Sequence, residues 1–72
     1  MTKKYLIVIE ETHSGYSAYS PDIDGCIATG KSKKEVEKNI HDAIEFHLEG
    51  IVLEGHKVPE PRSYSKTMEV AA

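Results

Sequence analysis

The stretch Tyr19–Glu35, with the sequence YSPDIDGCIATGKSKKE, decides how the chain on either side of it can fold. Pro21 has no N–H to donate to a strand ladder, so a strand that arrives at this point has to end. Residues 22–25 then suit a tight connection, and the apolar residues 26–28 follow it. The first half of the stretch is therefore predicted to join two antiparallel strands.

The second half of the stretch is predicted to start a helix. Gly30 is expected to take a positive φ angle where the chain turns. Ser32 and Glu35 have the spacing of a capping box, in which each side chain accepts a hydrogen bond from the other residue's backbone. The helix is predicted over Lys33–Glu54 and ends at Gly55. Its apolar stripe consists of Val36, Ile40, Ala43, Ile44, His47, Leu48 and Ile51.

The remaining regular structure is predicted to be β. Tyr5–Ile9 is rich in β-branched residues and is expected to be the central strand. A hairpin leads to Tyr16–Ser20, and Ile27–Thr29 completes an antiparallel meander. Tyr64–Val70 is predicted as a short fourth strand. The order β-β-β-α-β predicts an α+β fold in which one long helix packs on one face of a three-stranded sheet.

The composition indicates a small globular domain. The chain has 72 residues and is expected to form a single domain over residues 1–72. The apolar run near the N-terminus is too short for a signal peptide or a membrane span, and the single cysteine has no partner for a disulfide within the chain. A cytoplasmic protein is expected. The formal net charge of −3 disfavours phosphate binding, so a basic protein partner is expected rather than a nucleic acid or a membrane.

No pattern in the chain predicts catalysis, a cofactor or a metal site. A metal-dependent nuclease needs converging carboxylates, and the candidates are Glu10, Glu11, Asp22 and Asp24. The two glutamates point to opposite faces of their strand and the two aspartates fit turn positions, so structural roles are expected for all four. His41 and Glu45 are one helical turn apart, but no further histidine or cysteine within reach completes a site.

Two residues of the predicted core carry potentially reactive groups. His47 lies near the middle of the apolar stripe and is expected to be buried and hydrogen-bonded to the backbone. Cys26, which follows Gly25, has no cationic neighbour in the motif to lower its pKa, so a packing role is expected.

An acidic side of the helix admits two interpretations. Asp42, Glu45 and Glu49 share this side, and Glu49 and Glu54 near the C-terminal end oppose the charge that the helix dipole favours there. The side is either a solvated acidic face or a docking patch for a basic protein.

Phe46 and Leu53 form a second feature with two interpretations. They lie one heptad apart beside the apolar stripe, with Gly50 between them. Either they widen the core face, or they form a contact with a partner or within a homo-oligomer, a dimer or a tetramer.

The motif Tyr-x-Pro-Asp-Ile-x-Gly-Cys-x-x-x-Gly at residues 19–30, followed by Ser-x-x-Glu at residues 32–35, resembles the HicB-like antitoxin family. Asp24 stands where the family usually has proline, and Val36 where it usually has alanine. The resemblance covers most of the chain. The matching residues are Tyr19, Pro21, Asp22, Ile23, Gly25, Cys26, Gly30 and Glu35, with Gly55, Pro59 and Pro61 after the helix.

The resemblance implies a partial ribonuclease H-like fold in which the last strand lies parallel beside the first. It further implies a non-catalytic antitoxin that binds a small basic toxin, the mRNA interferase HicA, and masks its active site. The partner contacts expected on this basis are Tyr19, Pro21, Asp22, Ile23, Asp42, Glu45 and Glu49.

Many members of that family continue into a DNA-binding domain, whereas this chain stops at Ala72, so direct DNA binding is not expected. Two alternatives remain open. The chain is either a solitary, oligomeric binding module with a regulatory role and no toxin, or a cryptic nuclease.

Overall fold

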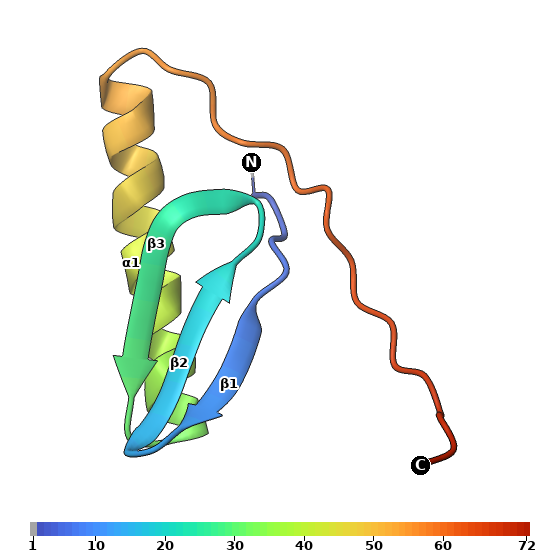
Figure 1. Ribbon diagram of the computed structural model, residues 1–72. Coiled ribbons are helices and arrows are strands. Elements are labelled where there is room, and N and C mark those ends of the chain that lie inside the picture. The colour runs from blue at the N-terminus through green and yellow to red at the C-terminus, as the bar shows by residue number, and fades with distance from the viewer. Residues whose placement is uncertain (1) are drawn as a thin grey trace.

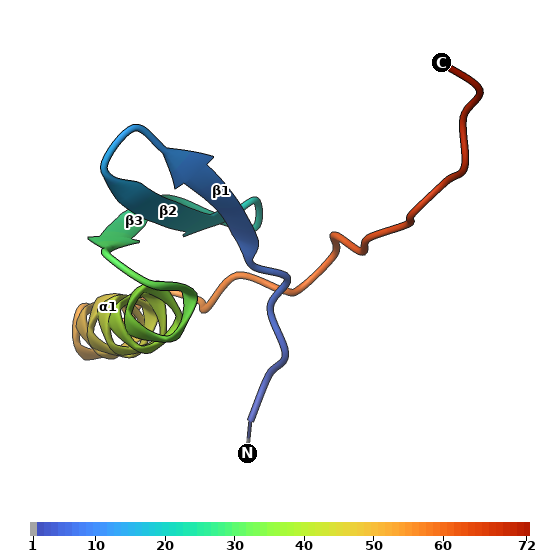
Figure 2. The same ribbon diagram turned by 90° about the horizontal axis from the view of Figure 1, so that it is seen from below.

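The computed structural model describes residues 2–72 and contains two layers, a sheet and a helix. Strands β1 (Val8–Thr12), β2 (Gly15–Ser20) and β3 (Ile23–Gly30) form an antiparallel sheet in the order β1-β2-β3. Helix α1 (Lys33–Leu53) covers one face of that sheet, and none of the described residues forms a layer over the other face (Figures 1 and 2). The predicted α+β fold, with a three-stranded meander and one long helix, is confirmed.

The core lies between α1 and the covered face of the sheet. On the helix side it is built from residues four apart, Val36, Ile40 and Ile44, whose exposed fractions are 7% or less. The sheet contributes Ala18, Ile23 and Cys26. The helix residues belong to the predicted apolar stripe, so the 3.6-residue period identified the face of α1 that is buried.

The start of α1 is held by the predicted cap, with one difference. The backbone N–H of Glu35 donates to Ser32 Oγ at 3.1 Å, as a capping box requires. The Glu35 carboxylate, however, accepts from the backbone N–H of Lys31 at 3.1 Å rather than from Ser32.

Gly30 does not have the predicted positive φ angle; among the described residues that conformation occurs only at Gly25 and Gly55. Gly30 is required for another reason. A Cβ atom at this position would lie 2.6 Å from Val36 N, so the end of β3 touches the backbone of the first turn of α1. Glycine therefore permits the close approach of strand and helix.

The end of α1 agrees with prediction. Gly55 has a φ of 78°, and its N–H donates to Val52 O at 3.0 Å. The N–H of His56 donates to Ile51 O, also at 3.0 Å. These two bonds form a Schellman motif and satisfy carbonyl groups that the helix end would otherwise leave unpaired.

The predicted strand positions need two corrections. Tyr5–Ile9 was expected to be central, but β1 spans Val8–Thr12 and is an edge strand. Short connections on both sides of β2 make it pair with both neighbours, and β2 therefore occupies the centre. β3 begins at Ile23, four residues before the predicted start, because a register shift at Tyr19/Ser20 lets the chain resume pairing at once.

The predicted fourth strand over Tyr64–Val70 is not formed in the single chain. Residues 64–72 are all exposed and extend away from the body, which gives the molecule dimensions of 48 × 26 × 20 Å (Figures 1 and 2). The β propensity of these residues is not sufficient, because a strand needs a neighbouring strand to accept and donate its backbone hydrogen bonds. The expected parallel pairing of this segment with the first strand is likewise not present.

Candidate functional site

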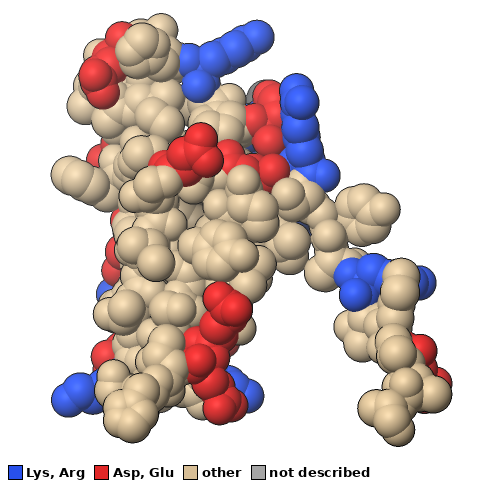
Figure 3. All heavy atoms as spheres, in the orientation of Figure 1, with Lys and Arg blue, Asp and Glu red and all other residues tan. Residues whose placement is uncertain are grey.

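The uncovered face of the sheet carries an apolar row that crosses all three strands. Val8 pairs with Tyr19, and Tyr19 pairs with Ile27, so the three side chains lie side by side on the face turned away from α1. Tyr19 is 39% exposed and Ile27 is 68% exposed. We call Val8, Tyr19 and Ile27 the open-face row. Figure 3 shows this face, with acidic side chains above and below an uncharged middle.

The row contains one residue that the sequence singled out and two that it did not. Tyr19 was an expected partner contact, and its exposed position on the open face is compatible with that role. Ile27 and Val8 were not among the expected partner contacts. Once the strand register is known, their direct pairing with Tyr19 places their side chains on the same face of the sheet. Pro21 is exposed in the turn between β2 and β3.

Ile23 is not available to a partner. Its exposed fraction is 2%, and it packs in the core with Val36 and Ile40. The expected partner contact at Ile23 is therefore replaced by a structural role. Its burial follows from the early start of β3, which turns the side chain towards α1.

Asp22 holds the segment that follows α1. One carboxylate oxygen, Oδ2, accepts from the backbone N–H groups of Arg62 at 3.0 Å and Ser63 at 2.9 Å, and Oδ1 accepts from Ser63 Oγ at 3.0 Å. These hydrogen bonds lower the pKa of Asp22, and the largest contributions come from the backbone N–H groups of Ser63 and Arg62, in that order. Asp22 was expected to bond locally in its turn or to contact a partner, but its carboxylate bonds residues 40 and 41 positions away.

Two further contacts join the N-terminal residues to the same segment. Tyr5 Oη donates to Pro59 O at 2.6 Å, and Lys3 Nζ lies 3.1 Å from Glu60 Oε1. The chain from Pro59 to Ser63 is therefore held at three places, and it runs past the beginning of β1 (Figure 1).

The acidic residues of α1 lie on the other layer of the molecule. Asp42, Glu45 and Glu49 are all exposed on the helix, whereas the open-face row lies on the sheet face turned away from it. Lys38 Nζ lies 2.7 Å from Asp42 Oδ2, and this hydrogen bond is the largest cause of the lowered pKa of Asp42 and the raised pKa of Lys38. The structure thus does not bring the two predicted groups of partner contacts onto one surface.

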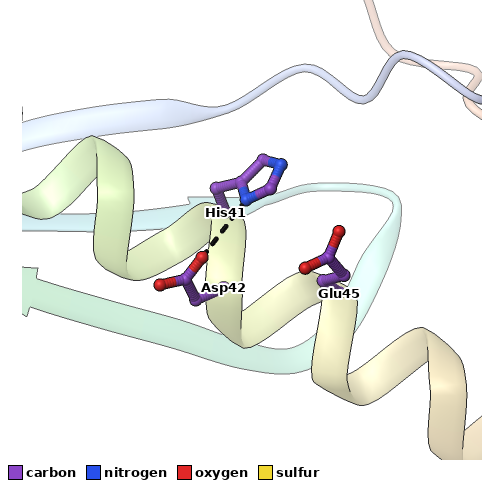
Figure 4. A group of neighbouring side chains, drawn as sticks. All are labelled: His41, Asp42 and Glu45. Atoms are coloured by element: carbon purple, nitrogen blue, oxygen red, sulfur yellow. Dashed lines mark hydrogen bonds and ion pairs between the residues drawn. The ribbon is translucent and has the colours of Figure 1, made fainter.

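His41, Asp42 and Glu45 are the group within residues 2–72 whose spacing could suit a metal ion (Figure 4). Their ligand atoms lie within 4.8 Å of one another, and all three side chains are exposed. The Asp42 carboxylate already bonds Lys38 and lies 3.3 Å from His41 Nδ1. We assign no metal site here, because nothing excludes water from these ligands and one of them is neutralised by a lysine. Glu10, Glu11, Asp22 and Asp24 form no such group.

The second half of α1 carries exposed apolar residues. Phe46 is 79% exposed and Leu53 is 86% exposed, and both line a shallow hollow of about 310 Å³ together with Gly50. Phe46 and Leu53 lie two and nine positions after the buried Ile44, so the helical period places both on the opposite side of α1 from the sheet. They do not widen the core.

His47 lines the same hollow and differs from expectation. It is half-buried rather than buried, and within residues 2–72 its ring makes no hydrogen bond. The apolar period placed it on the correct stripe but carries no information about where the sheet beneath the helix ends. Cys26, by contrast, is 8% exposed, and burial raises the pKa of its thiol. No helix within the described part of the chain is long and apolar enough to cross a membrane.

Comparison with known proteins agrees with this fold. Residues 5–71 match the family model of the HicB-like antitoxin of bacterial toxin-antitoxin systems. A UPF0150 protein of Synechocystis is 31% identical over 67 residues, which covers 92% of this chain and 85% of that protein. An uncharacterised 14.9 kDa protein of Haemophilus phage HP1 is 36% identical over 56 residues, and the chain spans only 42% of its length.

Two solved structures share the fold. One is the HicA3 and HicB3 toxin-antitoxin complex, with a TM-score of 0.70 and 37% identity over 82% of this chain and 70% of the matched chain. The other is the antitoxin HicB3, with a TM-score of 0.68 and 38% identity over 79% of this chain and 42% of that chain. Because the family model matches nearly the whole chain and the fold agrees, this protein belongs to the HicB-like antitoxins of bacterial toxin-antitoxin systems.

Proposed function

We propose that the chain is an antitoxin that binds and neutralises a small basic HicA-like mRNA interferase. The observation that carries the proposal is the similarity, at 37% identity and a TM-score of 0.70, to a chain of the HicA3 and HicB3 toxin-antitoxin complex. The chain acts by covering the toxin and performs no reaction of its own. Since an mRNA interferase acts where mRNA is found, the proposed place of action is the cytoplasm.

The proposed docking surface is the open-face row together with Pro21, which is exposed in the turn two residues after Tyr19. An apolar centre with an aromatic anchor and acidic side chains above and below it suits a basic protein partner, because buried apolar contacts supply affinity and charge supplies orientation (Figure 3). A standard-sized interface takes about 800 Å² from each partner. The chain exposes 6198 Å², so one face is sufficient and the helix layer remains free.

Asp42, Glu45 and Glu49 are proposed to act at a distance. They lie on the other layer, where they add to the net charge of −3 and accelerate encounter with a cationic toxin without contacting it. The same charge gives no basic surface for DNA phosphates, so we assign no DNA-binding role to these residues.

The proposal is tested by measuring association of the purified chain with a purified HicA-like toxin, the kind of partner proposed above. We expect Tyr19→Ala to weaken binding by about tenfold or more, mainly through faster dissociation, because truncated aromatic anchors often cost this much. Val52→Ala removes an exposed apolar side chain from the helix end and is the matched control, with little expected effect. Equal losses from both variants, or no complex at micromolar concentration, would contradict the proposal.

Glu45→Gln combined with Glu49→Gln separates steering from contact. We expect the association rate of this double variant to fall and to depend less on salt, while the dissociation rate stays the same. A change confined to the dissociation rate would place these residues in the interface instead.

A second candidate function is a homo-oligomeric binding module without a toxin. It is favoured by the exposure of Phe46 and Leu53 around Gly50, a geometry that suits close packing of two helices. Phe46→Ala would then shift the oligomeric state. An unchanged oligomeric state and an unchanged partner affinity would remove this role for Phe46.

A further inference from the structure

Within residues 2–72, no strand lies beside the outer edge of β1. The sheet order is β1-β2-β3, so β1 offers unpaired backbone N–H and C=O groups along its outer side. An exposed edge of this kind is a template for another strand. The question is which segment fits it.

A groove beside this edge adds an apolar side-chain site. It lies between α1 and the N-terminal residues, has a volume of about 620 Å³, and is lined on the strand side by Tyr5, Ile7 and Ile9. On the helix side it is lined by Ile40, Ile44 and Leu48, and its charged or titratable lining consists of Glu37, Glu45, His41 and Lys3. A strand added to β1 would place alternate side chains over this groove.

Residues 64–70 have the side-chain pattern of such a strand. Tyr64, Met68 and Val70 are 86%, 72% and 81% exposed and occupy alternate positions, which face one way in an extended chain. Lys66 shares their side and would meet the acidic residues of the groove, whereas Thr67 lies on the opposite side. The alternation of apolar side chains therefore matches the apolar lining of the groove, and Lys66 suits Glu37 and Glu45, while Lys3 on the same lining is already paired with Glu60.

Residues 64–70 do not lie beside β1 of their own chain, and the hydrogen bonds that hold the two residues before them explain why. The three hydrogen bonds to Asp22 fix Arg62 and Ser63, and from there the chain runs outward (Figure 2). No glycine or proline follows Pro61, so the sequence contains no residue that favours a sharp return. The Cα radius of gyration is 13.9 Å, against about 11 Å for a compact chain of this length.

We propose that residues 64–70 of one copy add to the free edge of β1 in a second copy, with Met68 and Val70 in that copy's groove, and that the exchange is reciprocal. The Asp22 bonds stay intact in both copies, because the segment only has to reach outward. Two such contacts related by a two-fold axis close the assembly and cover both free edges. The contact involves neither the open-face row nor a toxin, so it holds or fails independently of the proposed function.

The direct test is an isotope-filtered NOE experiment on the full chain without toxin. Equal amounts of labelled and unlabelled protein are mixed, unfolded and refolded together. We expect NOEs from the Met68 and Val70 methyl groups to Ile9 and Ile40 that join a labelled chain to an unlabelled one. The same NOEs found only within one chain, in a monomer, would show that the segment closes on its own β1. Their absence would show that the groove is not its site, and either result overturns the proposal.

A matched pair of variants tests the same contact by sedimentation velocity. Met68→Asp places a charge on the groove side and is expected to raise the dimer dissociation constant by about tenfold or more. Thr67→Asp adds the same charge on the opposite side and is expected to change the constant by less than about threefold. Circular dichroism checks that both variants fold. A dimer that survives Met68→Asp but dissociates with Phe46→Ala would assign self-association to the helix end and contradict the exchange.

Discussion

Substitution of Gly30 by alanine tests the contact between the two layers. An added Cβ would lie 2.6 Å from Val36 N and 2.9 Å from Val36 Cα. These are backbone atoms, so no side-chain rotation can relieve the contact, and the first turn of α1 has to move away from β3. Val36 is fully buried, and this movement therefore opens the core around it.

The expected cost follows from that geometry. Forcing an extra carbon atom into a closely packed contact typically costs about 1–3 kcal/mol. In a domain of this size each kcal/mol lowers the melting temperature by about 4–8 °C. We therefore expect Gly30→Ala to lower it by about 5–20 °C. This is a large fraction of the stability of a domain with so small a core.

Gly50→Ala is the matched control, because it makes the same chemical change inside α1. A Cβ at Gly50 meets nothing within 4 Å, so the alanine gains helix propensity without strain and should raise stability by about 0.5–1 kcal/mol. Thermal unfolding followed by circular dichroism, at one protein concentration for all variants, gives both values. Opposite signs for the two substitutions are predicted. An unchanged or raised melting temperature for Gly30→Ala would refute the close approach of β3 and α1.

Three further outcomes are expected. Ser32→Ala removes the oxygen that caps α1 and should lower the free energy of unfolding by about 1 kcal/mol in urea titrations; no change would mean that the cap is redundant. Because the pKa of Asp22 is lowered in the folded chain, its hydrogen bonds from the Arg62 and Ser63 amides should persist at neutral pH and be lost only as the pH falls below about 3.9. Hydrogen exchange of these two amides should show this loss. Asp22→Asn should weaken their protection at neutral pH and remove its dependence on pH. Cys26 should react with a thiol reagent slowly in the folded protein and rapidly in urea, since burial both shields the thiol and raises its pKa; equal rates would contradict its place in the core.

Features set by neighbouring residues were predictable from the sequence. The Ser32–Glu35 spacing located the start of α1 and Gly55 located its end, because a cap and a Schellman motif are formed by residues within one turn. The period of 3.6 identified the face that Val36 and Ile40 bury. The antiparallel meander followed from short, turn-rich connections.

Features that depend on distant residues were not predictable. The bonds from Asp22 to Ser63 join positions 41 residues apart, and no local pattern indicates them. The sequence placed His47 on the apolar stripe, but its exposure depends on where the sheet ends beneath the helix. The β propensity of Tyr64–Val70 predicted a strand, but a strand forms only where it lies beside another one, and these residues run outward instead of along β1. The open-face row of the candidate site required the strand register, which a shift at Tyr19/Ser20 alters.

The central claim, that this protein neutralises a toxin by covering it, is tested most directly by an RNA-cleavage titration. A purified HicA-like toxin is incubated with RNA, and increasing amounts of the chain are added. The account predicts that cleavage falls in proportion to added chain and stops near stoichiometric binding, with Tyr19→Ala requiring a larger excess. Cleavage that continues at full rate in a micromolar excess of the chain would contradict it.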